Sequence, residues 1–407
     1  MALASHWLFL YDLQTYLGDP QRDLRGPSKV KNNLALLEGQ RAEPRNIGGN
    51  GQKNKPVVSV VMVICNVERF LREAIESILE QTYRDFEFII VDFGSTDKSK
   101  AMAAGYTATD DRITLHEIPH CDVARARNVG CFLAQGRYIA VMDADDVSLP
   151  NRLMLEVDFM EKHPEIGLLG GAAEWIDARG KPLWAIDVPT EDEKIKAALR
   201  THYPFSHTAV LVRTKAFAHV GGYRSAFSYA EDYDLGLRIS DQFQCANLPQ
   251  IVVKYRIHPN QLSLTKRKQQ TLCKLAAQAS ALSRRIAHID PLNGVSEITP
   301  AVLAAIGVTE AVQQAHISAE YQCWIGVMSK AGEYRVALKS SAEALWSDPN
   351  RDARLHIANL HFSAAKFNWQ KKRCFRGFLA ASNAMIFHPG IARLFIQAMR
   401  RRLHFNL

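Results

Sequence analysis

The chain has 407 residues, of which 47% are apolar and 23% are charged, a composition typical of globular proteins and long enough for two domains. Its seven cysteines are scattered without a CxxC pair, which argues against a disulfide framework and a structural zinc site. No apolar run reaches the roughly 18 residues that a spanning helix needs, so we expect a cytoplasmic protein with reduced thiols.

The formal charge of +8 is concentrated near the end of the chain. Residues 351–407 contain eleven Lys and Arg residues and one acid, which leaves a charge of −2 for residues 1–350. Because the basic residues of the main part are matched by acids, we expect no nucleic acid among its partners.

Residues 1–55 have little periodicity and end in "NIGGNGQKNKP", so we expect a poorly ordered leader and linker. Strands then alternate with helices, which predicts an α/β fold with a mostly parallel sheet covered on both faces. The predicted strands are 57–64, 86–92, 112–118 and 137–143, and the predicted helices are 68–83, one starting near 97, and 123–135.

Carboxylates follow two of these strands. "YIAVMDADD" ends a strand with Asp143, Asp145 and Asp146, and "IIVD" ends another with Asp92. Ligands of open parallel sheets bind beyond the carboxyl ends of the strands. No glycine-rich phosphate loop accompanies them, so a bound nucleotide would need a counter-charge such as a divalent cation held by carboxylates. The alternative is a solvated turn that caps the following helix.

Residues 266–407 have no strand-like runs and predict a helical C-terminal domain. The segment 321–350 has the small and aromatic residues of a tetratricopeptide-like hairpin, through which protein partners could bind; an ordinary helical bundle is the alternative. The basic helix after Pro389 could lie on an anionic membrane or pack on its neighbour.

Four segments in order resemble one family: "VVSVVMVICNVERFLREAIESILEQTYRDFEFIIVDFGSTDKS", "VARARNVG", "MDADD" and "AEDYDLGLRI". They resemble the inverting nucleotide-sugar glycosyltransferases of family 2, over residues 56–262. The resemblance implies a GT-A catalytic domain at 56–265, with a Rossmann-like central sheet and flanking helices.

The resemblance also implies roles for several residues. Asp145 would coordinate Mn²⁺ or Mg²⁺, and Asp143 would contact the ribose of the donor or assist the metal. His258, in "VVKYRIHPNQLS", would complete the metal shell or touch the diphosphate; a surface histidine is the alternative.

Three further residues match the family at the donor and acceptor sides. Arg127 would contact the phosphate or base of the donor, or else form an ion pair within the domain. Asp92 would assist nucleotide binding. Asp232, in the Glu231–Asp232 pair, would be the general base that takes the proton of the acceptor hydroxyl; N-terminal helix capping is the alternative, and Asp234 is a nearby competitor.

The sequence departs from the family around the expected nucleotide base. Val63 and Cys65 replace its usual loop residues, and Phe93 stands where a second acid is usual. Gly236 replaces a frequent Trp, which could enlarge the acceptor side. These departures motivate a rival hypothesis, a catalytically weakened member that acts as a scaffold in a glycan-assembly complex.

The main hypothesis is the metal-dependent, inverting transfer of single sugars. The resemblance implies a nucleotide-sugar donor, with a UDP-sugar first, and a glycan or lipid-linked acceptor in bacterial exopolysaccharide, capsule or lipopolysaccharide assembly. The absence of a Gln-x-x-Arg-Trp motif argues against a processive synthase. Peripheral association with the inner face of the cell membrane is expected if the tail binds lipid.

Overall fold

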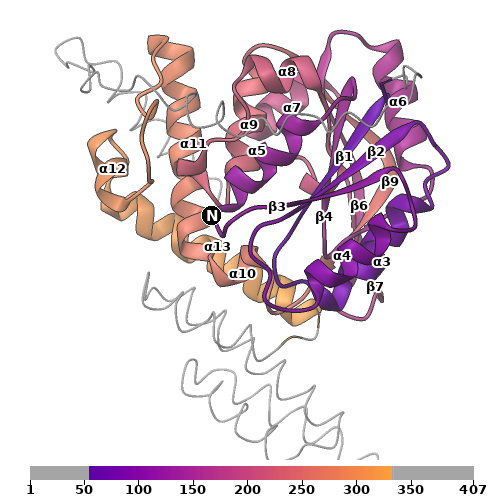
Figure 1. Ribbon diagram of the computed structural model, residues 1–407. Helices are drawn as coiled ribbons and strands as arrows, with labels where there is room; N and C mark the ends of the chain where they lie inside the picture. Colours follow the sequence, from indigo (N-terminus) through magenta and orange to yellow (C-terminus); the bar gives the residue numbers. More distant parts are fainter. Residues whose placement is uncertain (1–54, 332, 334–407) are drawn as a thin grey trace, which may run out of the picture.

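The computed structural model describes residues 55–331 and 333. The leader, the later part of the tetratricopeptide-like hairpin and the basic tail lie outside the described residues. One mixed sheet forms the centre of the described part, with strand order β3-β2-β1-β4-β8-β6-β9-β5 and β7 paired with β6 (Figure 1).

The first half of the sheet is parallel and has the predicted β/α alternation. Strand β1 pairs with both β2 and β4, and β2 pairs with β3, all in parallel. The strands are β1 (Val58–Ile64), β2 (Phe86–Asp92), β3 (Ile113–Glu117) and β4 (Tyr138–Asp143), and the helices between them are α3 (Glu68–Leu79), α4 (Ser99–Thr107) and α5 (Val123–Leu133).

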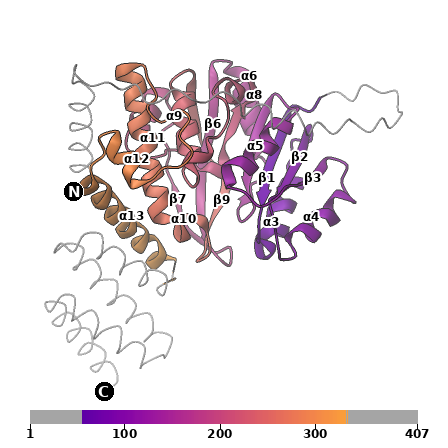
Figure 2. The same cartoon turned by 60° about the vertical axis from the view of Figure 1, so that its left-hand side comes forward.

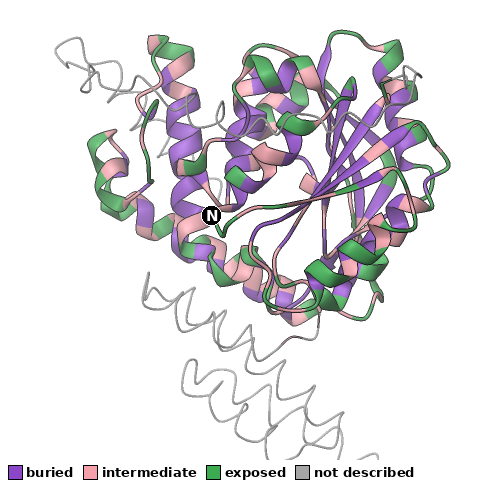
Figure 3. Ribbon diagram, viewed as in Figure 1, coloured by how far each residue is buried: buried purple, intermediate pink, exposed green. Residues whose placement is uncertain are grey.

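Helix α3 shows why the periodic pattern predicted these elements. The apolar residues spaced three or four apart, from Phe70 and Leu71 to Ile78, are all buried, whereas Arg72 and Glu73 between them face solvent. Strands β1, β2 and β4 are buried almost throughout, which accounts for their nearly continuous apolar runs, whereas β3 at the edge is partly exposed (Figure 3).

The second half of the sheet adds antiparallel pairs, because β8 pairs with β4 and β6, while β9 runs parallel to β6 and antiparallel to β5. Its strands are β5 (Val147–Ser148), β6 (Ile166–Asp177), β7 (Pro182–Ile186), β8 (Leu211–Arg213) and β9 (Gln244–Ile257). Its helices are α6 (Arg152–Lys162), α7 (Asp192–Leu199), α8 (Thr214–His219) and α9 (Glu231–Ser240), with the short 3-10 turns η1 (His207–Ala209) and η2 (Ser225–Phe227).

Helices follow the sheet, as the sequence predicts for the region after 265. They are α10 (Leu262–Thr265), α11 (Arg267–Ala287), α12 (Pro300–Ala305) and α13 (Glu310–Lys330), and α11 to α13 lie together at one side of the molecule (Figure 2). Buried residues of α11 and α13 belong to the same hydrophobic cluster as residues of β1, β2 and α5. The core is therefore continuous across residue 265, and the domain boundary proposed there stays a prediction.

The register of the parallel half brings the predicted site together. Val63 of β1 is paired with Asp143 of β4, and Ile64 is paired with Asp92 of β2. The carboxyl ends of three neighbouring strands thus place two of the predicted aspartates on either side of β1.

Candidate active site

The turn after β4 gives its three aspartates different surroundings. The amide of Asp146 bonds the carbonyl of Asp143 at 3.3 Å, and the Asp146 carboxylate accepts a 2.7 Å bond from the Arg256 amide of β9. Asp146 is buried, and burial together with the charges of Asp145 and Asp143 raises its pKa well above the usual value. Asp146 therefore fastens the turn to β9, whereas Asp143 and Asp145 are about a quarter exposed, with side-chain exposures of 22% and 27%.

Capping of the following helix, the alternative role for these aspartates, does not fit this turn. Helix α6 begins at Arg152, its N-cap residue is Asn151, and no side chain caps it. The aspartates lie further upstream, so helix capping does not explain their presence.

Arg127 of α5 joins two acids from distant parts of the chain. Its Nη2 donates to Asp143 Oδ1 at 2.8 Å, and its Nη1 donates to Glu231 Oε1. The predicted ion pair within the domain is therefore present. Burial alone would raise the pKa of Asp143, but the surrounding positive groups, with Arg127 first among them, together hold this pKa below its usual value.

The ion pair with Arg127 also distinguishes Glu231 from Asp232, the next residue at the start of α9. The side chain of Glu231 is 3% exposed and turned toward Arg127, whereas that of Asp232 is 25% exposed. Asp232 Oδ1 accepts a 2.8 Å bond from the amide of Tyr233, so the carboxylate does interact with the first turn of the helix. The competitor Asp234 is buried and paired with Arg224 and Arg238, whereas Asp232 remains partly exposed.

Asp145 and His258 meet directly. His258 Nε2 lies 2.9 Å from Asp145 Oδ2, and the histidine is only 8% exposed, so the alternative of a surface histidine is wrong. Gln261 holds the histidine loop, because its Oε1 accepts a 2.8 Å bond from the His258 amide. The ring of Phe70 packs on the imidazole with 4.8 Å between centroids.

Asp92 is the last residue of β2, and Phe93 begins the loop that follows. Asp92 is buried and accepts bonds of 3.3 and 3.4 Å from the Ser95 amide. Phe93 stacks on His120 with 6.1 Å between ring centroids and is 9% exposed. The place of the usual second acid is therefore filled by a ring that already has a stacking partner.

Comparisons with known proteins identify the family of this chain. The sequence pattern of the family described as glycosyl transferase family 2 matches residues 59–224 of this chain. A glycosyltransferase of Methanocaldococcus jannaschii is 33% identical over 231 residues, which are 54% of this chain and 78% of the relative. The chain belongs to glycosyltransferase family 2. The α/β sheet with helices on both faces is the GT-A fold that the resemblance predicted, and the protein is a glycosyltransferase.

Two bacterial relatives are similar over about half of this glycosyltransferase. EpsE of Bacillus subtilis is 38% identical over 49% of this chain and 73% of its own length. The O-antigen biosynthesis glycosyltransferase WbnJ of Escherichia coli is 30% identical over 50% of this chain and 80% of its own length. Among the described residues of the glycosyltransferase, no helix is long and apolar enough to cross a membrane.

Sequence reasoning missed one buried residue next to Asp232 in the candidate site. His207 of η1 lies with its Nδ1 4.0 Å from Asp232 Oδ2, and neither of its ring nitrogens has a hydrogen-bond partner among the described residues. Burial lowers its pKa to about 4, and the charge of Arg127 adds to this effect, so the ring is neutral at pH 7. No motif marks "PFSHTAV", because the position of His207 depends on a 3-10 turn and on pairing between β4 and β8.

Gly236 does not open the acceptor side as predicted. A Cβ atom at this position would lie 2.9 Å from the ring of Tyr203. The tyrosine therefore occupies the space next to the glycine, and we correct the expectation accordingly.

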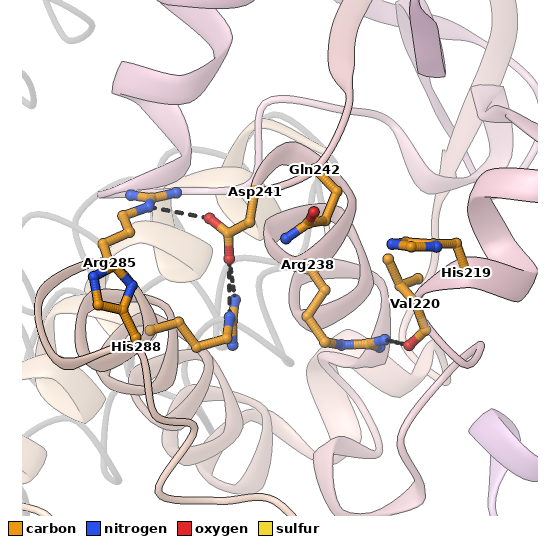
Figure 4. Close-up of a pocket in the computed structure, with 8 residues that line it drawn as sticks. His219, Val220, Arg238, Asp241, Gln242, Arg285 and His288 are labelled. Atoms are coloured by element: carbon orange, nitrogen blue, oxygen red, sulfur yellow. Dashed lines mark hydrogen bonds and ion pairs between the residues drawn. The ribbon is translucent and has the colours of Figure 1, made fainter.

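A cavity of about 460 Å³ lies at the other end of α9 from Asp232 (Figure 4). Its arginines already have partners: Arg284 and Arg285 bind Asp241, and Arg238 binds Asp234 and the carbonyl of Val220. This cavity is lined by a structural network of ion pairs, and it shares no lining residue with the site of Asp143, Asp145 and Asp232.

Proposed function

We propose that this glycosyltransferase moves single sugars, with inversion, from a nucleotide-sugar donor to a glycan or lipid-linked acceptor. The observation that carries the proposal is the ion-pair chain from Asp143 through Arg127 to Glu231. It ties the end of β4 to the start of α9, where the side chain of Asp232 stays 25% exposed. A donor-binding carboxylate and a candidate base are thus parts of one connected site.

The residues present fit a divalent cation. Asp145 and His258 offer one carboxylate and one imidazole, donors that suit Mn²⁺, and Mg²⁺ also binds through one or two carboxylates plus substrate phosphates. No group of three or more candidate ligands occurs among the described residues. We therefore propose that Asp145 and His258 hold the ion together with the diphosphate of the donor. The ion would neutralise charge on the departing diphosphate.

Asp232 supplies the proton acceptor of the reaction. As the acceptor oxygen bonds to the anomeric carbon, its proton moves to a free oxygen lone pair of Asp232. The bond between the anomeric carbon and the phosphate oxygen breaks on the opposite face, and the nucleoside diphosphate leaves with the electron pair. Attack from that face inverts the anomeric configuration.

The biological role is proposed from the names of similar proteins. WbnJ is named for O-antigen biosynthesis, so we propose a role in bacterial exopolysaccharide, capsule or lipopolysaccharide assembly, with a UDP-sugar as the first candidate donor. Acceptors of this class lie at the inner face of the cell membrane, where we propose that the protein acts.

The test is calorimetric binding of UDP, GDP, dTDP and CDP, each with and without Mn²⁺. We expect one nucleotide to bind in a metal-dependent way, and Asp145→Asn to weaken this binding by about tenfold or more, a loss of about 1.4 kcal/mol. Asp232→Asn should bind the nucleotide like the wild type, because Asp232 acts on the acceptor. Asp158→Asn, an exposed acid on α6, is the matched control.

Two results would count against the proposal. Failure of all four nucleotides to bind a folded protein would contradict the metal and donor assignments and favour the scaffold hypothesis. Retention of the anomeric configuration, measured by proton NMR of the product, would contradict direct displacement assisted by Asp232.

A further inference from the structure

The imidazole of His207 is buried without the hydrogen bonds that a structural histidine usually makes. Its side chain is 11% exposed, and neither nitrogen has a partner among residues 55–331 and 333. A buried polar atom left unpaired lowers the stability of the fold, and such atoms in native structures call for an explanation. Arg127 Nε and Glu231 Oε2 are also unpaired, so four orphaned atoms gather around this site.

The surroundings of His207 limit what the ring can do. The charged groups that act on it are Arg127 of α5, Asp143 of β4, Arg152 of α6 and Asp232 of α9. Because burial and Arg127 keep the ring neutral at pH 7, it has one N–H group and one lone pair to offer.

The backbone and one aromatic ring fix the place of His207. The amide of Val210 bonds the His207 carbonyl at 3.2 Å, and the hydroxyl of the next residue, Thr208, accepts a 3.2 Å bond from the Asp143 amide. The ring of Tyr223 packs edge-on against the imidazole with 6.1 Å between centroids. His207 therefore sits on the segment that also supports the turn after β4.

Asp232 has one oxygen available to this ring. The Tyr233 amide holds Oδ1, whereas Oδ2 lies 4.0 Å from His207 Nδ1. An approach of about 1 Å would bring these two atoms to the usual length of an N–H···O hydrogen bond. The Asp232 side chain is 25% exposed, so packed protein covers only part of this carboxylate.

We propose that His207 is the positioning residue of Asp232, whose carboxylate it orients by donating the Nδ1–H to Oδ2. This role rests on the function proposed above, in which Asp232 takes the proton of the acceptor. The hydrogen bond limits rotation of the carboxylate, so that a free lone pair stays directed at the incoming hydroxyl. A misplacement of about 1 Å can cost on the order of 100-fold in rate, which is the scale of effect expected here.

The first test needs no catalytic activity. Full-length protein labelled with ¹⁵N-histidine is examined by long-range ¹H–¹⁵N NMR at pH 7, and the His207 signals are identified by their loss in His207→Asn. We expect a neutral ring protonated at Nδ1, and a shift toward the Nε2–H form in Asp232→Ala. A ring protonated at Nε2, or at both nitrogens, in the wild type would overturn the proposal.

The second test asks which of the two ring nitrogens, Nδ1 or Nε2, carries the function. An Asn side chain places its amide nitrogen near the position of Nδ1, whereas Gln reaches toward Nε2. The assay follows release of nucleoside diphosphate from the sugar nucleotide whose nucleotide binds in calorimetry, with water as the acceptor. We expect His207→Leu and His207→Gln to lower kcat by about 10- to 100-fold at an unchanged KM, and His207→Asn to stay within about threefold of the wild type.

The outcomes distinguish this inference from the proposed function. A raised KM with unchanged kcat, or rescue by Gln and not by Asn, would overturn the positioning role. Unchanged nucleotide binding by all three variants shows that they are folded and that the donor site is intact. If the wild type binds no nucleotide, the proposed function fails, while the NMR tautomer still decides whether His207 donates to Asp232.

Discussion

Arg127 is the residue on which the geometry of the site depends. It is the shared partner of an acid on β4 and an acid on α9, which are 88 positions apart in the sequence. Removing one member of a buried ionic group leaves the others without compensation, which costs more than the group contributes as a whole.

The first prediction concerns this bridge. Arg127→Met should lower the free energy of unfolding by about 3 kcal/mol, because Glu231 is left buried and unpaired. Urea denaturation measures the change. Arg125→Met, two residues away on the exposed face of α5, is the matched control and should change it by less than about 0.5 kcal/mol. A loss no greater than that of the control would contradict the bridge.

The second prediction uses the pH dependence of stability. The pKa of His207 is about 4 in the folded protein and 6.5 in its ordinary state, so the unfolded chain takes up a proton first as the pH falls. The folded state should therefore lose on the order of 3 kcal/mol between pH 6.5 and pH 4 through this group. His207→Asn should flatten this part of the curve of unfolding free energy against pH. An unaltered curve would show that the ring is solvated.

At the scale of elements, the close approach of α5 to the sheet depends on Gly130. A Cβ atom there would lie 2.5 Å from Val61 Cγ1 of β1 and 3.2 Å from Val91 Cγ2 of β2. Both valines are β-branched and packed in the core, so neither side chain can easily move away. The glycine therefore sets how near Arg127, on the same helix, comes to the strand ends.

The third prediction compares two helical glycines. Gly130→Ala should destabilise the protein by about 1–3 kcal/mol because of overpacking, although alanine favours a helix. A Cβ atom at Gly105 of α4 would have no neighbour within 4 Å. Gly105→Ala should therefore stabilise the protein by about 0.5–1 kcal/mol. Thermal unfolding of both variants would show shifts of opposite sign. Shifts of the same sign would contradict the packing of α5.

The sequence predicted the parallel elements well because each has a local signal. The predicted strands 57–64 and 86–92 match β1 and β2 to within one residue, whereas the predicted helix 68–83 begins with α3 at Glu68 but extends beyond its end at Leu79. Elements in the second half of the sheet were harder to predict from the sequence, because β8 and η1 are only three residues long and have no periodic pattern. His207 could not be found in this way, because nothing local indicates that it faces a carboxylate 25 positions later.

At the scale of the whole molecule, α11 and α13 are fastened to the sheet by an aromatic and ionic contact. Trp324 of α13 stacks on Trp175 of β6 with 6.0 Å between centroids, and the Arg267 guanidinium lies 4.2 Å from the Trp324 ring. Glu320 pairs with Lys274 at 2.9 Å and with Arg267 at 3.5 Å. Burial lowers the pKa of Arg267 to about 10, which Glu320 opposes.

The fourth prediction tests whether these helices unfold together with the sheet. Glu320→Gln should cost about 2 kcal/mol, because the buried Arg267 loses its counter-charge. Glu310→Gln, exposed in the first turn of the same helix, should cost less than about 1 kcal/mol. Fluorescence and circular dichroism should report one coincident transition in both variants. Two separate transitions would show that the helices form a unit of their own.

The order of strands also has a consequence for synthesis on the ribosome. Strand β8 separates β4 from β6, and β9 lies between β6 and β5, so strands made late fill the interior of the sheet. A nascent chain that stops before residue 244 would leave open edges on β5 and β6, which are templates for wrong pairing. It would also lack His258, although Asp143 and Asp145 had already emerged. The contact between Asp145 and His258 can thus form only after β9 has been made.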